Sequence, residues 1–253
     1  MGELGADADL ARVLATEAAG LLLRVRRQFA RADATRRGDE GDRQAQAFLA
    51  RRLAEARPDD AVLSEESLDD RRRLQAARVW IIDPLDGTRE FAELDRKDWA
   101  VHVALWQSGD LVAGAVALPA QGLTLCTHDV RCNAPTARSP RILVSRTRPP
   151  ALASFIARAL SGELVPMGSA GAKVAAIIQG GADVYVHAGG QHEWDSAAPV
   201  AVARAAGLHT SRIDGSPLQY NRPDPLLPDL LVCRQELAPY LIDSLREWGK
   251  SGR

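Results

Sequence analysis

Apolar residues recur at helical spacing in two early segments of the chain. The first runs from Asp9 to Ala30, and its apolar positions are Leu10, Val13, Leu14, Ala18, Leu21, Leu22 and Val25. The second is predicted to begin at Asp42 as its N-cap and to end near Ala56, before Pro58. Each pattern puts the apolar residues on one face, which predicts an amphipathic helix. The Gly- and charge-rich segment 31–41 between them is predicted to be a flexible loop that closes over the site as a lid.

Short apolar runs predict strands in the rest of the first half. Residues 79–82 form a continuous apolar run that should be a buried strand stopping at Asp83-Pro84. Further runs stand at 61–63, 99–106, 111–118 and 123–126. The break at 107–110 is typical of a hairpin turn. We therefore expect mainly antiparallel strands packed on the two helices.

A change of composition at 133–140 marks a predicted boundary, because Ala, Pro, Ser and Arg dominate there. Predicted strands at 141–145, 164–166, 183–187 and 230–233 then alternate with predicted helices at 150–160, 170–178, 194–206 and 236–248. Such alternation predicts an α/β unit. The expected organisation is an α+β half at 1–135 and an α/β half at 136–253.

Composition excludes several functional classes. The chain has 253 residues with 32 basic and 33 acidic side chains, which argues against nucleic-acid binding through overall charge. Cys126, Cys132 and Cys233 lack metal-ligand spacing, and the five histidines suggest no ligand pair. No apolar run approaches 18 residues, and the first ten residues do not resemble a secretory signal. We expect a cytoplasmic enzyme.

The candidate chemistry follows the buried strand. Asp83 and Asp86 flank Pro-Leu in a turn that Gly87 permits, so both carboxylates and the Leu85 carbonyl can aim at one point. Oxygen ligands on a rigid turn suit Mg²⁺. The backbone N–H groups of Gly87 and Thr88 can then start a helix and face a phosphate.

The alternative interpretation is a solvated Asp-Gly turn without function. Two further acidic pairs argue against it: Glu65-Glu66 ends a predicted strand, and Glu193 and Asp195 begin a predicted helix. Carboxylates gathered at one point repel each other unless a cation is present. A metal cluster therefore explains them better than a structural turn.

These motifs resemble those of the inositol monophosphatase superfamily. The matching segments are Asp83-Pro-Leu-Asp-Gly-Thr88, the preceding Glu65-Glu66 and the later Trp194-Asp195-Ser-Ala-Ala198, in the family's order. The resemblance covers residues 9–245. It implies a layered αβαβα sandwich and a Mg²⁺-dependent, lithium-sensitive phosphatase.

Four details resemble the CysQ-type 3'(2'),5'-bisphosphate nucleotidases within that superfamily. They are Thr88-Arg-Glu-Phe91, the turn at 168–173, the spacing from 182–186 to 193–195, and the late turn at 214–220. The resemblance implies hydrolysis of 3'-phosphoadenosine 5'-phosphate to AMP and phosphate, a reaction of sulfate assimilation. Inositol 1-phosphate and fructose 1,6-bisphosphate are alternative substrates. A non-catalytic phosphonucleotide sensor is a further alternative.

The resemblance also assigns roles to residues of this chain. Glu65, Asp83 and the Leu85 carbonyl would hold one Mg²⁺, and Asp83, Asp86 and Asp195 a second, with two or three ions per active site. Thr88 and a carboxylate behind it would position and help deprotonate the attacking water. That carboxylate is predicted to be Asp42, with Asp39 as the alternative, and Glu66 would orient a ligand or a water.

Substrate contacts are predicted for a wider set: Glu65, Leu85, Asp86, Gly87, Thr88, Ser169, Lys173, His187 and Asp195. Ser169 and Lys173 are expected to hold the phosphate that does not react. His187 is either a weaker phosphate contact or a histidine whose ring is satisfied by backbone. Tyr220 either stacks on adenine or lies in the core. A monomer or a homodimer is expected, with no nucleic-acid or membrane partner.

Overall fold

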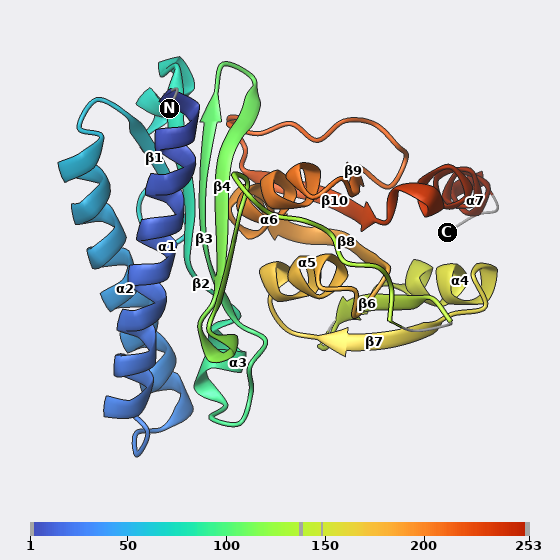
Figure 1. Ribbon diagram of the computed structural model, residues 1–253, viewed down its shortest axis with the longest axis horizontal. Coiled ribbons are helices and arrows are strands. Elements are labelled where there is room, and N and C mark those ends of the chain that lie inside the picture. The colour runs from blue at the N-terminus through green and yellow to red at the C-terminus, as the bar shows by residue number, and fades with distance from the viewer. Residues whose placement is uncertain (1–2, 137–138, 148, 251–253) are drawn as a thin grey trace.

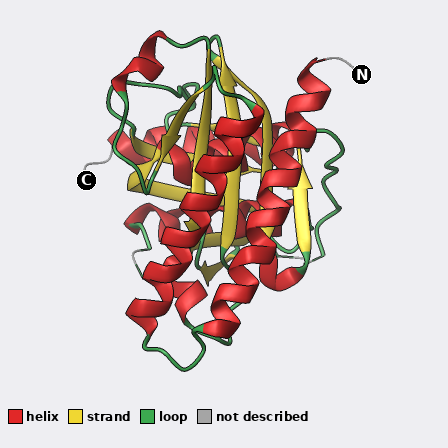
Figure 2. Cartoon of the chain, turned by 90° about the vertical axis from the view of Figure 1, so that its left-hand side faces the viewer, coloured by secondary structure: helices red, strands yellow, loops and turns green. Residues whose placement is uncertain are grey.

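Five layers of helices and sheets lie side by side in the computed structural model, which describes residues 3–136, 139–147 and 149–250 (Figure 1). Helices α1 (Glu3–Gln28) and α2 (Ala34–Ala56) form the first layer, and they cover the outer face of the first sheet (Figure 2). The first sheet is followed by α5 (Ala170–Ile178) and α6 (Glu193–Ala205), and the second sheet by α4 (Ala151–Ala159) and α7 (Ala238–Lys250). The predicted αβαβα sandwich is confirmed.

Helix α2 begins nine residues earlier than predicted. Its N-cap is Asp33, whose carboxylate accepts the backbone N–H of Arg36 at 2.9 Å. The prediction that Asp42 caps this helix was wrong, and most of the segment predicted as a flexible lid is helical. The guanidinium of Arg37 is buried and donates to the carbonyls of the preceding turn, which fixes the start of the helix.

The glycines of this segment serve close packing, which the sequence pattern did not reveal. A Cβ on Gly38 would lie 2.8 Å from Cγ2 of Thr88. A Cβ on Gly41 would lie 2.8 Å from side-chain atoms of both Leu85 and Phe91. These distances are too short for real contacts, so the glycines let α2 approach the short helix α3 (Thr88–Ala92). The approach brings Asp42 to Thr88.

The first sheet has the strand order β1-β2-β3-β4-β5, with β1 parallel to β2 and the other neighbours antiparallel. Its strands are β1 (Ala61–Ser64), β2 (Arg78–Asp86), β3 (Ala100–Gln107), β4 (Asp110–Leu118) and β5 (Leu123–Cys126). Strand β2 does not stop at Ile82 as predicted. It pairs with β3 at Asp83 and again at Asp86, with an irregular register between them. An irregularity of this kind changes the direction of nearby side chains, here those of Asp83 and Asp86, relative to a regular strand.

The second sheet has the order β7-β6-β8-β10-β9. Its strands are β6 (Arg141–Ser145), β7 (Glu163–Met167), β8 (Val184–His192), β9 (His209–Ser211) and β10 (Leu226–Cys233). Strand β6 is parallel to β7 and β8, whereas β10 is antiparallel to β8 and β9. The short β9 was not predicted, because three residues carry too little periodicity. The division into halves at residue 135 stays a prediction.

Helices α5 and α6 pack closely against the first sheet. Helix α6 carries buried alanines toward β4, where a Cβ on Gly114 would lie 2.8 Å from the Cβ of Ala201. Small residues on both elements permit this short separation. The packing sets the first turn of α6, and with it Asp195, beside the end of β2. Within the described residues, no helix is long and apolar enough to cross a membrane.

Candidate active site

Three carboxylates converge where β2 ends and α6 begins. An oxygen from each of Asp83, Asp86 and Asp195 lies within 4.8 Å of the others. Asp83 is fully buried, and its Oδ1 accepts the backbone N–H of Leu85 at 3.0 Å. Its Oδ2 is buried without a hydrogen-bond partner. An unpartnered carboxylate oxygen beside two other carboxylates is an arrangement that a bound cation would stabilise.

Asp86 is fixed from the middle layer. Its Oδ2 accepts the hydroxyl of Ser169 at 2.5 Å and the backbone N–H of Gly171 at 2.8 Å. Nε2 of His102 lies 3.1 Å from the same oxygen. Burial alone would raise the pKa of Asp86, but His102 and the two donors outweigh it and lower that pKa.

His102 is a site residue that the sequence did not reveal. It is fully buried on β3, and its Nδ1 lies 3.2 Å from the Trp194 carbonyl, which can only accept. A Cβ on Gly171 would lie 2.2 Å from Nε2, so only glycine leaves room for the ring. No sequence pattern pointed to His102, because a single histidine within an apolar strand is typical of a core residue.

Asp195 is held by the first turn of α6. Its Oδ2 accepts the backbone N–H of His192 at 2.6 Å in a capping box. Glu193, almost fully buried, accepts the backbone N–H groups of Asn221 at 2.7 Å and Arg222 at 2.8 Å. Glu193 therefore braces the turn that presents Asp195, a structural role the sequence did not indicate.

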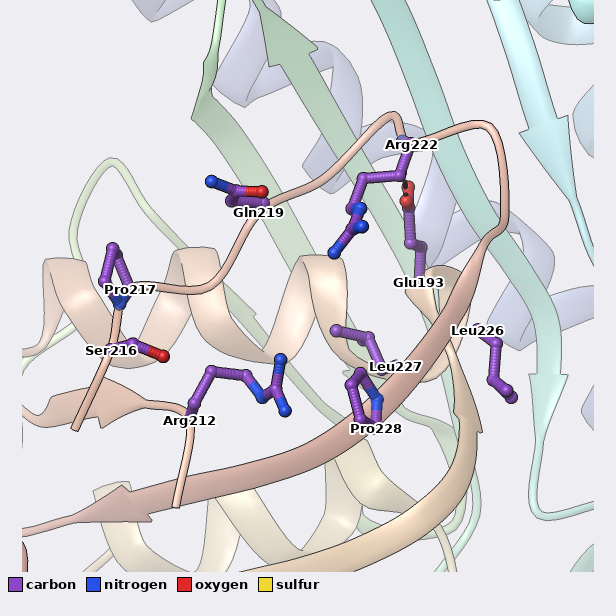
Figure 3. A pocket seen from close by; sticks show the side chains of 9 residues that line it. All are labelled: Glu193, Arg212, Ser216, Pro217, Gln219, Arg222, Leu226, Leu227 and Pro228. Carbon is purple, nitrogen blue, oxygen red and sulfur yellow. Dashed lines mark hydrogen bonds between the residues drawn. The ribbon is translucent and has the colours of Figure 1, made fainter. Parts of the chain in front are cut away.

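Glu193 also lines a pocket of about 190 Å³ (Figure 3). Figure 3 shows the side chains of Arg212 and Arg222 leaning into it from opposite sides. Arg212 is paired with Asp229 at 2.8 Å. Neither Thr88 nor any member of the carboxylate trio lines this pocket, so it is separate from the predicted site.

Thr88 and Asp42 meet as the resemblance implied. The Oγ of Thr88 lies 3.2 Å from Oδ1 of Asp42 and 3.3 Å from the Leu85 carbonyl. A hydroxyl has one proton, so it donates to one of these acceptors and keeps lone pairs for another donor. Burial and then the charge of Glu66 raise the pKa of Asp42 to about 7. Among the described residues, the carboxylate that hydrogen-bonds to Thr88 is that of Asp42 and not that of Asp39.

Glu65 is exposed and does not belong to the trio whose carboxylate oxygens lie within 4.8 Å of one another. Desolvation against the site and the charges of Asp195 and Glu66 raise its pKa to about 8. Burial and the charge of Asp86 raise the pKa of Asp195 to about 6, and the same two causes raise the pKa of Asp83 well above its usual range. Glu65, Asp83 and Asp195 thus all have raised pKa values, as expected of carboxyl groups that gather where a cation would bind.

A pocket of about 320 Å³ opens beside Thr88. Its walls come from Glu65, α3, the end of β6 and the turn before α5. Lys173 lies at its base and is buried, and its Nζ donates to the carbonyls of Gly168 at 2.8 Å and Ser169 at 3.0 Å. Desolvation lowers the pKa of Lys173 to about 8. Its predicted phosphate contact stays a prediction, as does that of Ser169.

The turn before α5, which carries Ser169, is hydrogen-bonded to the loop between α3 and β3. Asp98 pairs with Arg96, and its Oδ2 accepts the backbone N–H of Gly168 at 2.6 Å. Desolvation would raise the pKa of Asp98, but these two partners lower it. The pairing connects the two halves of the chain at the edge of the pocket.

His187 and Tyr220 each have a hydrogen-bond partner within the protein. His187 is half-buried on β8, and its Nε2 lies 2.8 Å from the Gly189 carbonyl, consistent with a ring satisfied by backbone. Tyr220 is buried in the core, with its hydroxyl 3.1 Å from that of Ser196. The structure therefore favours the core alternative for Tyr220 over stacking on a base.

Comparison with known proteins agrees with this architecture. A family model described as "Inositol monophosphatase family" matches residues 8–249. A 3'-phosphoadenosine 5'-phosphate phosphatase of Mycobacterium leprae is 53% identical over 254 residues, covering 95% of this chain and 94% of that protein. The 3'(2'),5'-bisphosphate nucleotidase CysQ of Escherichia coli is 32% identical over 178 residues, covering 64% and 71%.

Solved structures extend the agreement to the whole fold. The crystal structure of CysQ from Bacteroides thetaiotaomicron matches with a TM-score of 0.79 and 26% identity, covering 91% of this chain and 97% of that one. An inositol monophosphatase of Staphylococcus aureus matches with a TM-score of 0.78 at 18% identity, which shows the fold alone. Because the family model spans nearly the whole chain, this protein belongs to the inositol monophosphatase family.

Proposed function

We propose that this protein hydrolyses the 3'-phosphate of 3'-phosphoadenosine 5'-phosphate, giving AMP and inorganic phosphate. The observation that carries the proposal is 53% identity, over 95% of the chain, to a phosphatase named for that substrate. The clustered carboxylates of Asp83, Asp86 and Asp195 suit a divalent cation, and the Thr88–Asp42 pair beside them can handle the proton of an attacking water, which supports a metal-dependent hydrolase.

The donor set fits Mg²⁺. Asp83 offers a buried oxygen without a partner, and Asp86 and Asp195 stand within 4.8 Å of it. We infer that these three carboxylates, with Glu65 and the Leu85 carbonyl, hold two or three Mg²⁺ ions. When bound, such ions lower the pKa of water and stabilise charge on the phosphate and on the leaving oxygen.

Thr88 and Asp42 handle the proton of the attacking water. The Thr88 hydroxyl can donate to Asp42 and accept from a water at the same time, so it orients that water and connects it to a base. The water oxygen bonds to phosphorus, the bond to the 3'-oxygen breaks, and one proton reaches Asp42. The leaving oxygen takes a proton from solvent. Burial and, after it, the charge of Glu66 keep the pKa of this base high.

A direct test compares three substrates in the presence of Mg²⁺. Phosphate release is measured as kcat/KM on 3'-phosphoadenosine 5'-phosphate, inositol 1-phosphate and fructose 1,6-bisphosphate. A preference for the nucleotide of about tenfold or more, equal to about 1.4 kcal/mol of transition-state binding, supports the proposal. A preference for either sugar phosphate would leave the acidic site intact and refute the substrate. No release from any of them would favour the sensor alternative.

A further inference from the structure

The proposed substrate carries a second phosphate that does not react, and the acidic trio cannot bind it. A phosphate dianion needs positively charged donors within the same pocket. Glu65 and Glu90 line that pocket and repel an anion, so the cations on its walls decide whether it accepts a bisphosphate. Three cationic side chains line the pocket: Arg89, Arg146 and Lys173.

The ammonium group of Lys173 already has hydrogen-bond partners within the protein. Its ammonium donates to two carbonyls and lies 5.0 Å from the ring centre of Tyr185. Only 5% of the residue is exposed. Moving Nζ into the pocket would leave the carbonyls of the turn without their donor, at the point where Ser169 holds Asp86. Lys173 therefore braces this turn more readily than it reaches a ligand.

Arg146 has the geometry of an anion ligand. It follows β6, on the wall formed by Ser145 and Thr147. Its Nε and one Nη donate to the buried carboxylate of Glu90 at 3.0 and 2.8 Å, which fixes the plane of the guanidinium. The carboxylate of Glu93 also accepts from it at 2.7 Å, but Glu93 is about half exposed. An incoming phosphate can replace Glu93 while Glu90 keeps the guanidinium in place.

Arg89 also lines the pocket, from α3 directly after Thr88. It is exposed, and no ion pair to it is found among the described residues. Its guanidinium is therefore available, unlike those of the arginines that hold the fold together, such as Arg37. Two guanidinium groups, one from the residue after β6 and one from α3, match the oxygens of one phosphate group.

We propose that Arg146, assisted by Arg89, binds the non-reacting phosphate of the substrate and thereby determines the preference for bisphosphorylated nucleotides. The proposal rests on the proposed function. It assigns the specificity of the site to the end of β6 and to α3, and it gives Glu93 the role of the carboxylate that the phosphate displaces.

The test compares two nucleotides that differ only in that phosphate. Adenosine 3'-phosphate and 3'-phosphoadenosine 5'-phosphate present the same bond for hydrolysis, so the ratio of their kcat/KM values reports binding of the 5'-phosphate. Replacing Arg146 by alanine should lower kcat/KM for the bisphosphate about 10- to 100-fold, with less than about threefold effect on the monophosphate. Arg89→Ala should act in the same direction but more weakly.

Matched variants separate binding from general effects. Arg246→Ala removes the same charge from α7, in the outermost layer, and should leave the ratio unchanged. Arg146→Lys keeps the charge and should restore part of the preference. Glu93→Gln removes the competing carboxylate and should raise kcat/KM for the bisphosphate alone. Because Arg146 also pairs with buried Glu90, thermal melting of each variant confirms that the fold is retained.

The outcomes distinguish a failure of this assignment from a failure of the proposed function. If the wild-type enzyme prefers the bisphosphate and Arg146→Ala keeps that preference, this assignment is wrong and the proposed function stands. The same holds if both nucleotides react equally well in the wild type, or if Lys173→Met alone abolishes the preference. If neither nucleotide is hydrolysed while inositol 1-phosphate is, the proposed function itself fails.

Discussion

Replacing Asp83 by asparagine should make the metal-free protein more stable while abolishing turnover. Two carboxylates no more than 4.8 Å apart repel each other by about 3 kcal/mol at an effective dielectric constant of about 20. Asp83 has two such neighbours, Asp86 and Asp195. Part of this cost is relieved by proton uptake, because burial and the neighbouring charges raise the pKa of Asp83. We expect the free energy of unfolding to rise by about 1 to 3 kcal/mol.

The assay is thermal melting in the presence of a chelator. For a chain of this length the gain corresponds to a rise in Tm of about 2 to 10 °C. Asparagine can still accept from the N–H of Leu85 through its oxygen, so the turn should keep its form. In millimolar Mg²⁺ the order should reverse, because the wild-type protein gains stability from the ion and the variant gains little.

The pH dependence of the free energy of unfolding is a second, independent test of this prediction. The folded state takes up a proton at Asp83 that the unfolded chain, with its lower pKa, does not, so wild-type stability should fall as pH rises above about 4. In the variant this slope should be shallower. Asp243→Asn, which removes an exposed charge on α7, serves as the control. A variant no more stable than the wild type without metal, and equally stabilised by Mg²⁺, would refute the account of a cation site.

Three further substitutions test the surroundings of the site. Thr88→Val should lower kcat about 10²- to 10⁴-fold with little change in KM, whereas Thr88→Ser should keep most of the rate; an unaffected rate would dismiss the link to Asp42. Gly171→Ala, whose Cβ would lie 2.2 Å from His102, should cost about 1 to 3 kcal/mol in urea unfolding. The lowered pKa of Asp98 means that its ionised form stabilises the fold, and this contribution is lost as the pH falls below about 4. In Asp98→Asn the free energy of unfolding should therefore fall less steeply over that pH range.

The sequence alone determined the layered fold and most of the acidic site. Periodicity placed the long helices and the buried strands, because a 3.6-residue or continuous apolar pattern persists over many residues. The Asp83-to-Thr88 segment carried its own geometry, since proline and glycine constrain the turn locally. The boundaries failed where local signals misled: Gly38 and Gly41 suggested a loop, yet they allow α2 to contact α3.

Tertiary structure alone decided which side chains meet. His102 and Asp86 lie on neighbouring strands, and only the register of β2 against β3 brings them to 3.1 Å. Lys173 looked like a free cation in the sequence, but the turn before α5 uses it to satisfy two carbonyls. Arg146 is one of many arginines until folding sets it on the wall of the pocket. Long-range contacts of this kind depend on how the layers pack, and a local pattern of residue types does not contain that information.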